Sequence, residues 1–220
     1  MLSKLHILLL LIVATMASCT NSQEDQPSNT KNDGPLPIYG HKEFIEGMDE
    51  DTVYHVIPDW EFVNQDSVMI SKDDFIGQPY IAYFFFTTCP GICPAITGNM
   101  VHVEQELREE NIQFIAHTVD PAKDTVAALK EYAELFDIPT EKFHFITGDQ
   151  TTIYELGVKG YLVPNQEDAL APGGFLHSEK LILLDSKSRI RGYYDGTVNE
   201  QVEQLIIDAK KLIKDESKRN

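Results

Sequence analysis

The pattern of apolar and polar positions predicts strands that alternate with helices. Apolar residues run without interruption through 80–86, which is typical of a strand buried on both faces of a sheet, and a second buried strand is expected at 112–119. A shorter strand is expected at 143–146. Between and after these runs, apolar residues recur at helical spacing. The predicted helices span 95–109, 125–136, 150–156 and 198–214.

Two antiparallel hairpins complete the expected sheet. Residues 53–62 alternate imperfectly and are joined by a short polar turn to 66–70, which indicates a hairpin at the sheet edge. Residues 181–185 and 189–194 predict a second hairpin, and the loop 163–174 before it is rich in glycine and proline. We therefore expect an α/β fold, a sandwich whose mixed central sheet is flanked by helices, with an N-terminal edge hairpin.

The first eighteen residues have the layout of a secretory signal peptide. A short positive segment ending at Lys4 precedes an apolar run at 7–13, which is too short to span a bilayer comfortably. Small residues then lead to Cys19, and this resembles the lipobox of bacterial lipoproteins. The resemblance implies cleavage before Cys19 and a lipid on its thiol. The alternative is an ordinary signal peptide followed by an incidental cysteine.

This interpretation divides the chain into three parts. Residues 1–18 are the signal peptide, and 19–37 form a lipidated, disordered tether because the stretch is polar and has no hydrophobic period. Residues 38–220 form the folded domain, which we expect on the periplasmic side of the cell envelope. The net charge of −17 argues against nucleic acid and anionic membrane surfaces as partners, so the lipid is the expected membrane contact.

Cys89 and Cys93 follow the first apolar strand at the point where a helix begins. With Cys19 assigned to the lipid, they are the remaining two of three cysteines. Pro94 suits the first helical turn, and the positive partial charge of a helix N-terminus favours thiolate over thiol. A spacing of four residues brings both sulfur atoms to one side. The pair is a redox couple or part of a metal site, placed as in the thioredoxin-like fold. A local disulfide or two small core residues are the alternatives.

A third ligand is sought among the seven histidines. His177 follows the long loop rich in glycine and proline and directly precedes an apolar strand. In a thioredoxin-like sheet, the entrance to that strand lies beside the helix that carries the thiols. We therefore expect His177 to complete the site. The others lie in the signal peptide, at the domain edge, in predicted strands or on the helix after the cysteines; they are His6, His41, His55, His102, His117 and His144.

Three segments in this order resemble the SCO/SenC family of copper-binding proteins. They are TCPGICP at 88–94, TVDPAKDT at 118–125, and His177-Ser178 before a strand that ends in Asp185. The resemblance extends from Pro58 to the C-terminus. It implies that Cys89, Cys93 and His177 bind copper as Cu(I) or Cu(II). It also implies that the protein helps to assemble the dinuclear copper centre of cytochrome c oxidase.

The donor chemistry agrees with copper. Thiolates select Cu(I), and imidazole suits copper in either oxidation state. A structural zinc site or an iron–sulfur cluster usually has four protein ligands, and three are evident. Two departures from the family pattern lie outside these ligands: Leu176 stands where an acidic residue is frequent, and Phe143 and Phe145 where a tryptophan is frequent. Asp120 and Asp124 are expected as helix caps, with a role at the site or in docking as the alternative.

Three functions are compatible with this site. The first is a metallochaperone without catalytic activity, which delivers copper to the copper-accepting oxidase subunit. The second is a thiol–disulfide reductase: Cys89 attacks a disulfide of that subunit, Cys93 resolves the mixed disulfide, His177 modulates the thiolate, and a thioredoxin-like reductant restores the thiols. The third is a redox or copper sensor. Copper is favoured over general reductase work because three residues, rather than two, separate the cysteines and no proline directly precedes His177.

Overall fold

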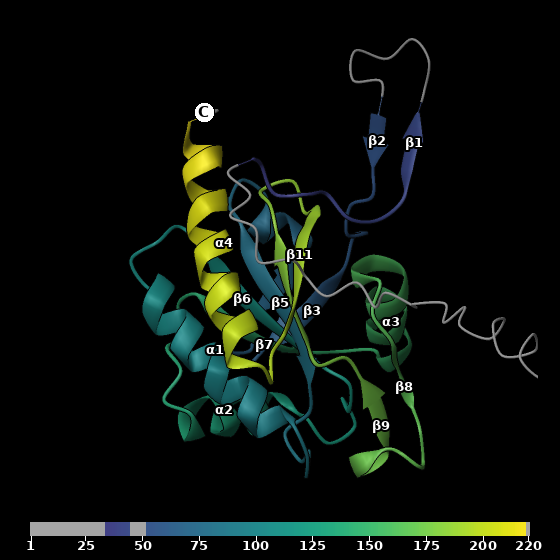
Figure 1. Ribbon diagram of the computed structural model, residues 1–220. Helices are drawn as coiled ribbons and strands as arrows, with labels where there is room; N and C mark the ends of the chain where they lie inside the picture. The colour runs from purple at the N-terminus through teal and green to yellow at the C-terminus, as the bar shows by residue number, and fades with distance from the viewer. Residues whose placement is uncertain (1–33, 45–51, 219–220) are drawn as a thin grey trace, which may run out of the picture. The chain divides into compact units, whose positions relative to one another are not determined.

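A seven-stranded mixed sheet runs through the domain in the order β11-β10-β5-β6-β7-β3-β4 (Figure 1). The strands are β3 (Glu61–Asn64), β4 (Met69–Ser71), β5 (Tyr80–Phe85), β6 (Gln113–Thr118), β7 (Phe143–Thr147), β10 (Lys180–Leu184) and β11 (Ile190–Asp195). The neighbours β5, β6 and β7 are parallel, and the other pairings are antiparallel. All six residues of β5 are buried, as expected for a central strand with apolar side chains on both faces.

Helices cover both faces of the sheet. Three lie on one face, where α1 packs against α4, and a shorter helix lies on the other (Figure 1). The first three are α1 (Cys93–Leu107), α2 (Val126–Leu135) and α4 (Asn199–Ser217); the shorter one is α3 (Gln150–Glu155), continued by the π-helical turn η2 (Leu156–Tyr161). The expected α/β sandwich with a mixed central sheet is confirmed.

The computed structural model describes residues 34–44 and 52–218, and from Gly34 onward the chain forms one compact unit. Within these ranges no helix is both long and apolar enough to cross a membrane. The expected signal peptide and the expected lipidation residue, Cys19, lie outside the described residues.

The expected edge hairpin is confirmed as β3 and β4, which pair antiparallel at one end of the sheet. A turn of 3-10 helix, η1 (Lys72–Phe75), follows it. The first strand is shorter than expected, because β2 (Thr52–Tyr54) pairs instead with β1 (Lys42–Phe44) in a separate two-stranded sheet. Pro58 lies between β2 and β3, where its missing N–H would interrupt a continuous ladder.

The loop rich in glycine and proline contains structure that the sequence pattern did not predict. A short antiparallel pair forms from β8 (Asn165–Glu167) and β9 (Phe175–His177), with the 3-10 turn η3 (Pro172–Gly174) between the two strands. This ribbon directly precedes β10, so it delivers the end of β9 to the edge of the sheet where β5 ends.

His117 lies in the centre of the aromatic core and has no exposed surface. Its ring stacks on Phe84 with the centroids 5.0 Å apart, and its Nε2 atom is hydrogen-bonded to the hydroxyl of Tyr161 at 2.9 Å. Burial lowers the pKa of His117 from 6.5 to about 3, because the charged imidazolium would lose its hydration. This histidine is therefore a neutral core residue.

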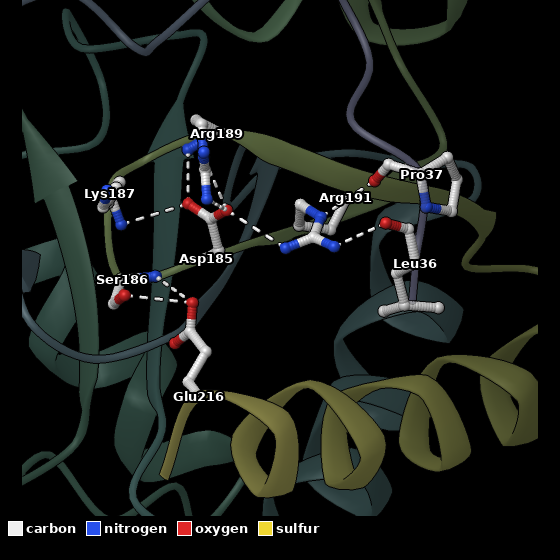
Figure 2. Close-up of polar contacts among 8 residues, drawn as sticks. All are labelled: Leu36, Pro37, Asp185, Ser186, Lys187, Arg189, Arg191 and Glu216. Atoms are coloured by element: carbon white, nitrogen blue, oxygen red, sulfur yellow. Dashed lines mark hydrogen bonds and ion pairs between the residues drawn. The ribbon is translucent and has the colours of Figure 1, made fainter. Parts of the chain in front are cut away.

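A buried carboxylate at the end of β10 organises the turn to β11. Asp185 accepts hydrogen bonds from the backbone N–H groups of Lys187 and Arg189, both at 3.0 Å. It also accepts from the guanidinium groups of Arg189 at 2.8 Å and Arg191 at 3.2 Å (Figure 2). Two cations and two backbone donors thus compensate one carboxylate that has no exposed surface.

The same network ties both ends of the domain to this turn (Figure 2). Arg191 donates to the carbonyl oxygens of Pro37 (2.8 Å) and Leu36, so these two residues, which the sequence pattern placed in the tether, are bound to the hairpin. From the last turns of α4, Glu216 accepts hydrogen bonds from the backbone and hydroxyl groups of Ser186. The N-terminal segment, the hairpin and the last helix therefore meet at one end of β10.

We expect replacement of His117 by phenylalanine to weaken the pH dependence of stability. The unfolded chain binds a proton near pH 6.5 and the folded chain only near pH 3, so the free energy of unfolding falls as the pH drops through this window, by up to about 1.4 kcal/mol per pH unit. The free energy of unfolding, measured with urea at several pH values between 6.5 and 4.5, should depend less steeply on pH for His117→Phe than for wild type. The same dependence on pH in the two proteins would contradict this account.

Removal of the buried carboxylate should cost far more stability than removal of an exposed neighbour. Asp185→Ala leaves Arg191 buried without its partner, and we expect a loss of about 3–5 kcal/mol in the free energy of unfolding. Lys187→Ala is the matched control, since its exposed side chain leaves the backbone contact to Asp185 intact, and its cost should be within about 0.5 kcal/mol. Similar urea midpoints for the two variants would reject the role assigned to Asp185.

Candidate metal centre

The two cysteines lie where β5 passes into α1. Cys89 belongs to the connecting loop, and Cys93 is the first residue of α1, with Pro94 in the first turn as expected. Their exposed fractions are 9% and 1%, and both are free thiols. The sulfur atoms thus lie just below the surface at the end of the central strand.

The expected preference for thiolate at the helix N-terminus is wrong for Cys93. Burial raises the pKa of its thiol, and the neighbouring thiol of Cys89 raises it further. The cost of removing a thiolate from water exceeds the benefit of the helix dipole here, because Cys93 is almost fully buried. In the metal-free protein Cys93 is therefore a neutral thiol.

The sheet brings His177 to the same place from a distant part of the sequence. His177 ends β9, and β10 then pairs antiparallel with β5, so its position lies beside the loop that follows β5. Its Nε2 atom is 3.3 Å from the Sγ atom of Cys93. One potential ligand atom from each of Cys89, Cys93 and His177 lies within 4.8 Å of the others, and this is the only such group of three among the described residues.

The orientation and charge of His177 suit a metal ligand. The Nδ1 atom is 3.3 Å from the carbonyl oxygen of Ser178, which can only accept, so Nδ1 carries the hydrogen and Nε2 presents its lone pair toward the sulfur atoms. The ring packs edge-on against Phe86, with 5.6 Å between centroids. Burial lowers the pKa of His177, which favours the neutral form that binds metals.

The turn η3 lies over the loop that carries Cys89. A Cβ atom on Gly91 would lie 3.9 Å from both Cys89 Sγ and Pro172 Cβ. Gly173 has a positive φ of 77°, and a Cβ atom there would lie only 2.6 Å from the ring of Phe86. Glycine is therefore required at this position both by its backbone conformation and by the close approach. The contact holds the loop before His177 against the thiol loop.

Asp120 and Asp124 do not cap α2, which corrects the expectation from the sequence. The cap is Thr125, whose hydroxyl accepts from the N–H of Ala128 at 3.3 Å. Asp124 is instead fully buried and accepts from the N–H of Thr87 at 3.1 Å. A segment with several potential caps before one helix does not reveal which of them turns inward.

Asp124 joins two loops at the carboxyl ends of parallel strands. Its carboxylate accepts from the hydroxyl groups of Thr87, which follows β5, and Thr118, which ends β6. Thr87 lies two residues before Cys89, so this contact positions the thiol loop. The sequence pattern does not reveal this role for either threonine, because hydroxyl residues after an apolar run usually indicate only a turn.

The remaining described histidines stand outside the cluster. His102 on α1 pairs with Glu203 at 2.8 Å, and His55 is bonded to the carbonyl oxygen of Gly160 at 2.7 Å. His117 and His144 are in strands, as expected, whereas His55 follows the end of β2 and does not lie in a strand. His6 lies outside the described residues.

The arrangement can do two kinds of chemistry. Two sulfur atoms and one imidazole nitrogen form a soft donor set that suits copper, and no fourth ligand for a structural zinc ion joins the cluster within the described ranges. The two free thiols are also close enough in space to act as a dithiol pair. Geometry alone therefore supports a metal carrier or a redox pair.

Comparison with known proteins identifies the family. The SCO1/SenC family profile matches residues 48–214. A SCO1/SenC family lipoprotein from Bacillus anthracis str. Ames is 26% identical, with a TM-score of 0.67 over 72% of this chain and 95% of its own. BsSco, in which a disulfide switch is identified, is a member of the Sco family of cytochrome c oxidase assembly proteins. It is 25% identical, with a TM-score of 0.65 over 73% of this chain and 94% of its own.

A third structure extends the likeness of the fold. Copper-bound ScoI from Bradyrhizobium japonicum is 21% identical, with a TM-score of 0.60 over 71% of this chain and 99% of its own. The family profile covers both the cysteine loop and the histidine that the sheet brings beside it. With the motifs in the expected order and the expected sandwich around them, the chain belongs to the SCO1/SenC family.

Proposed function

We propose that the protein is a metallochaperone that carries copper as its cargo, bound by Cys89, Cys93 and His177. The observation that carries the proposal is the convergence of these three donors within 4.8 Å, with both cysteines buried at the end of β5. Copper is preferred over zinc because the site offers two thiols and one imidazole rather than four ligands. ScoI of B. japonicum holds copper, so the fold is compatible with this cargo.

The acceptor that we propose is the subunit of cytochrome c oxidase that contains the dinuclear copper centre. BsSco belongs to a family of cytochrome c oxidase assembly proteins, which supports this direction of delivery. Two thiolates hold Cu(I) and the imidazole supports Cu(II), so the ligand set can keep its cargo through a change of oxidation state.

Proton transfer accompanies loading of the site. Cys93 is a neutral thiol before copper arrives, because burial raises its pKa, and it has to lose its proton to become a ligand. His177 is already neutral and needs no deprotonation. Copper binding therefore releases protons from the thiols, and the imidazole contributes none.

A thiol–disulfide reductase is the second candidate, favoured by the two free thiols and by the disulfide switch in BsSco. The Cys89 thiolate would attack a disulfide of the oxidase subunit, form a mixed disulfide and release one partner thiolate. Cys93 would then attack Cys89, release the second partner thiolate and leave a Cys89–Cys93 disulfide, so two electrons pass to the partner. A thioredoxin-like reductant would restore the thiols. A redox or copper sensor would use the same site with a different output.

We also propose that Cys19 carries a lipid that anchors the protein on the periplasmic side of the cell envelope, with the residues between Cys19 and Leu36 as the tether. The similar protein from B. anthracis is a lipoprotein, which supports this location.

Copper titration of the reduced protein, followed by visible absorption and EPR, tests the chaperone proposal. We expect one equivalent of Cu(II) with a sulfur-to-copper charge-transfer band, and loss of tight binding in Cys89→Ser and Cys93→Ser. His177→Ala should weaken the binding of Cu(II) more than that of Cu(I), because two thiolates remain for the softer ion. His102→Ala, an exposed histidine outside the cluster, is the matched control and should behave as wild type.

Two outcomes would count against this assignment. If His177→Ala kept the Cu(II) affinity and spectrum of wild type, His177 would not be the third ligand. Rapid formation of the Cys89–Cys93 disulfide without retained copper would favour the reductase.

Membrane fractionation tests the anchor. Wild-type protein should enter the detergent phase and carry the added mass of a lipid, whereas Cys19→Ala should lose both properties, because one cysteine provides the attachment point. Membrane retention of the Cys19→Ala variant at the wild-type level would show that another feature holds the protein there.

A further inference from the structure

The two chain segments that carry the cluster contain no charged side chain. Asp, Glu, Lys and Arg are absent between Asp74 and Glu104 and between Asp168 and Glu179, although these residue types make up 24% of the chain. The buried strand β5 accounts for part of the first segment. It does not account for the exposed residues around the thiols, since charged side chains usually occupy exposed positions.

These exposed residues form a neutral surface over the cluster, which comprises Pro90, Gly91, Ile92, Pro172, Gly173 and Leu176. Ile92 is 41% exposed and Leu176 is 39% exposed. The two segments meet where a Cβ atom on Gly91 would lie 3.9 Å from Pro172 Cβ. Both sulfur atoms lie below this surface, so a protein that takes metal from the cluster has to contact it.

Carboxylates border the neutral surface. Glu167 and Asp168 precede its second segment, and Glu179 follows it. Lys180, the next residue, is already paired with Glu179 at 2.9 Å and with Asp195 at 3.4 Å. The chain as a whole carries a charge of −17. The resulting field attracts a cationic surface and repels an anionic membrane or a second copy of this chain.

We infer that the neutral surface is the docking face for the copper-accepting protein, and that this partner is apolar where it meets Ile92 and Pro172 and basic at the margin of the contact. The inference rests on the proposed function and adds the chemistry of the partner. An apolar centre lets the two proteins exclude water from the metal ligands without burying unpaired charges. The acidic margin selects a basic partner and accelerates the encounter.

Copper transfer from the loaded full-length protein, in detergent, to the metal-free dinuclear-copper domain of the cytochrome c oxidase subunit tests the inference. Ile92→Lys should lower the second-order rate constant at least about tenfold, because it places an unpaired charge in the contact and repels a basic partner. Ile76→Lys is the matched control, because Ile76 is 50% exposed but lies before β5, at the end opposite the cluster. The rate constant of copper transfer from this variant should stay within about twofold of wild type. The wild-type rate should fall as salt is added.

Copper stoichiometry and the charge-transfer spectrum of both lysine variants should match wild type, which separates docking from metal binding. A wild-type transfer rate in Ile92→Lys, or a rate that rises with salt, would overturn the inference while leaving the proposed function intact. A wild-type dimer that Ile92→Lys converts to monomer would assign the surface to a second copy instead. If loaded wild-type protein does not transfer copper at all, the proposed acceptor is wrong and the docking partner is rejected with it.

Discussion

The antiparallel pairing of β10 with β5 is the constraint on which the candidate metal centre depends. Leu184 lies opposite Tyr80 and Ile182 opposite Ala82, so the chain before β10 reaches the level at which β5 runs into the thiol loop. His177 thereby meets a cysteine 84 residues away in sequence. A shift of this register by two residues would move the imidazole by about 7 Å along the strand, beyond the reach of both sulfur atoms.

Burial then sets the charge of the assembled cluster. It raises the pKa of Cys93 and lowers that of His177, so both groups are neutral before any metal arrives. A thiol pair can be buried at modest cost, whereas two thiolates without a cation would be expensive to remove from water. The cluster is therefore stable without metal, and the charge of a cation is what makes deprotonation of the thiols favourable.

The surroundings of the two ends of β10 differ in their charged side chains. At its end, Asp185 pairs with two arginines, and one of them, Arg191, also holds the N-terminal segment through a backbone carbonyl oxygen. Near its start, beyond the paired Glu179 and Lys180, the two segments that carry the cluster have no charged residue, and the exposed surface over the cluster is apolar. The ionic end can stabilise the fold because its partners are permanent. The docking that we infer at the neutral surface would not require an ion pair within that surface to be broken.

The sequence by itself determined the order of the strands in the central sheet and of the four α-helices, and the position of the thiol pair at a helix start, since periodicity and proline placement are local signals. It indicated His177 through the expected sheet, in which the entrance to the following strand lies beside the thiols. The tertiary structure decided which side chains turn inward. Asp124 became a buried acceptor for Thr87 and Thr118 rather than a cap, and Cys93 became a neutral thiol despite its place at a helix N-terminus. Both outcomes depend on desolvation, which is set by the residues packed around a group and not by its neighbours in sequence.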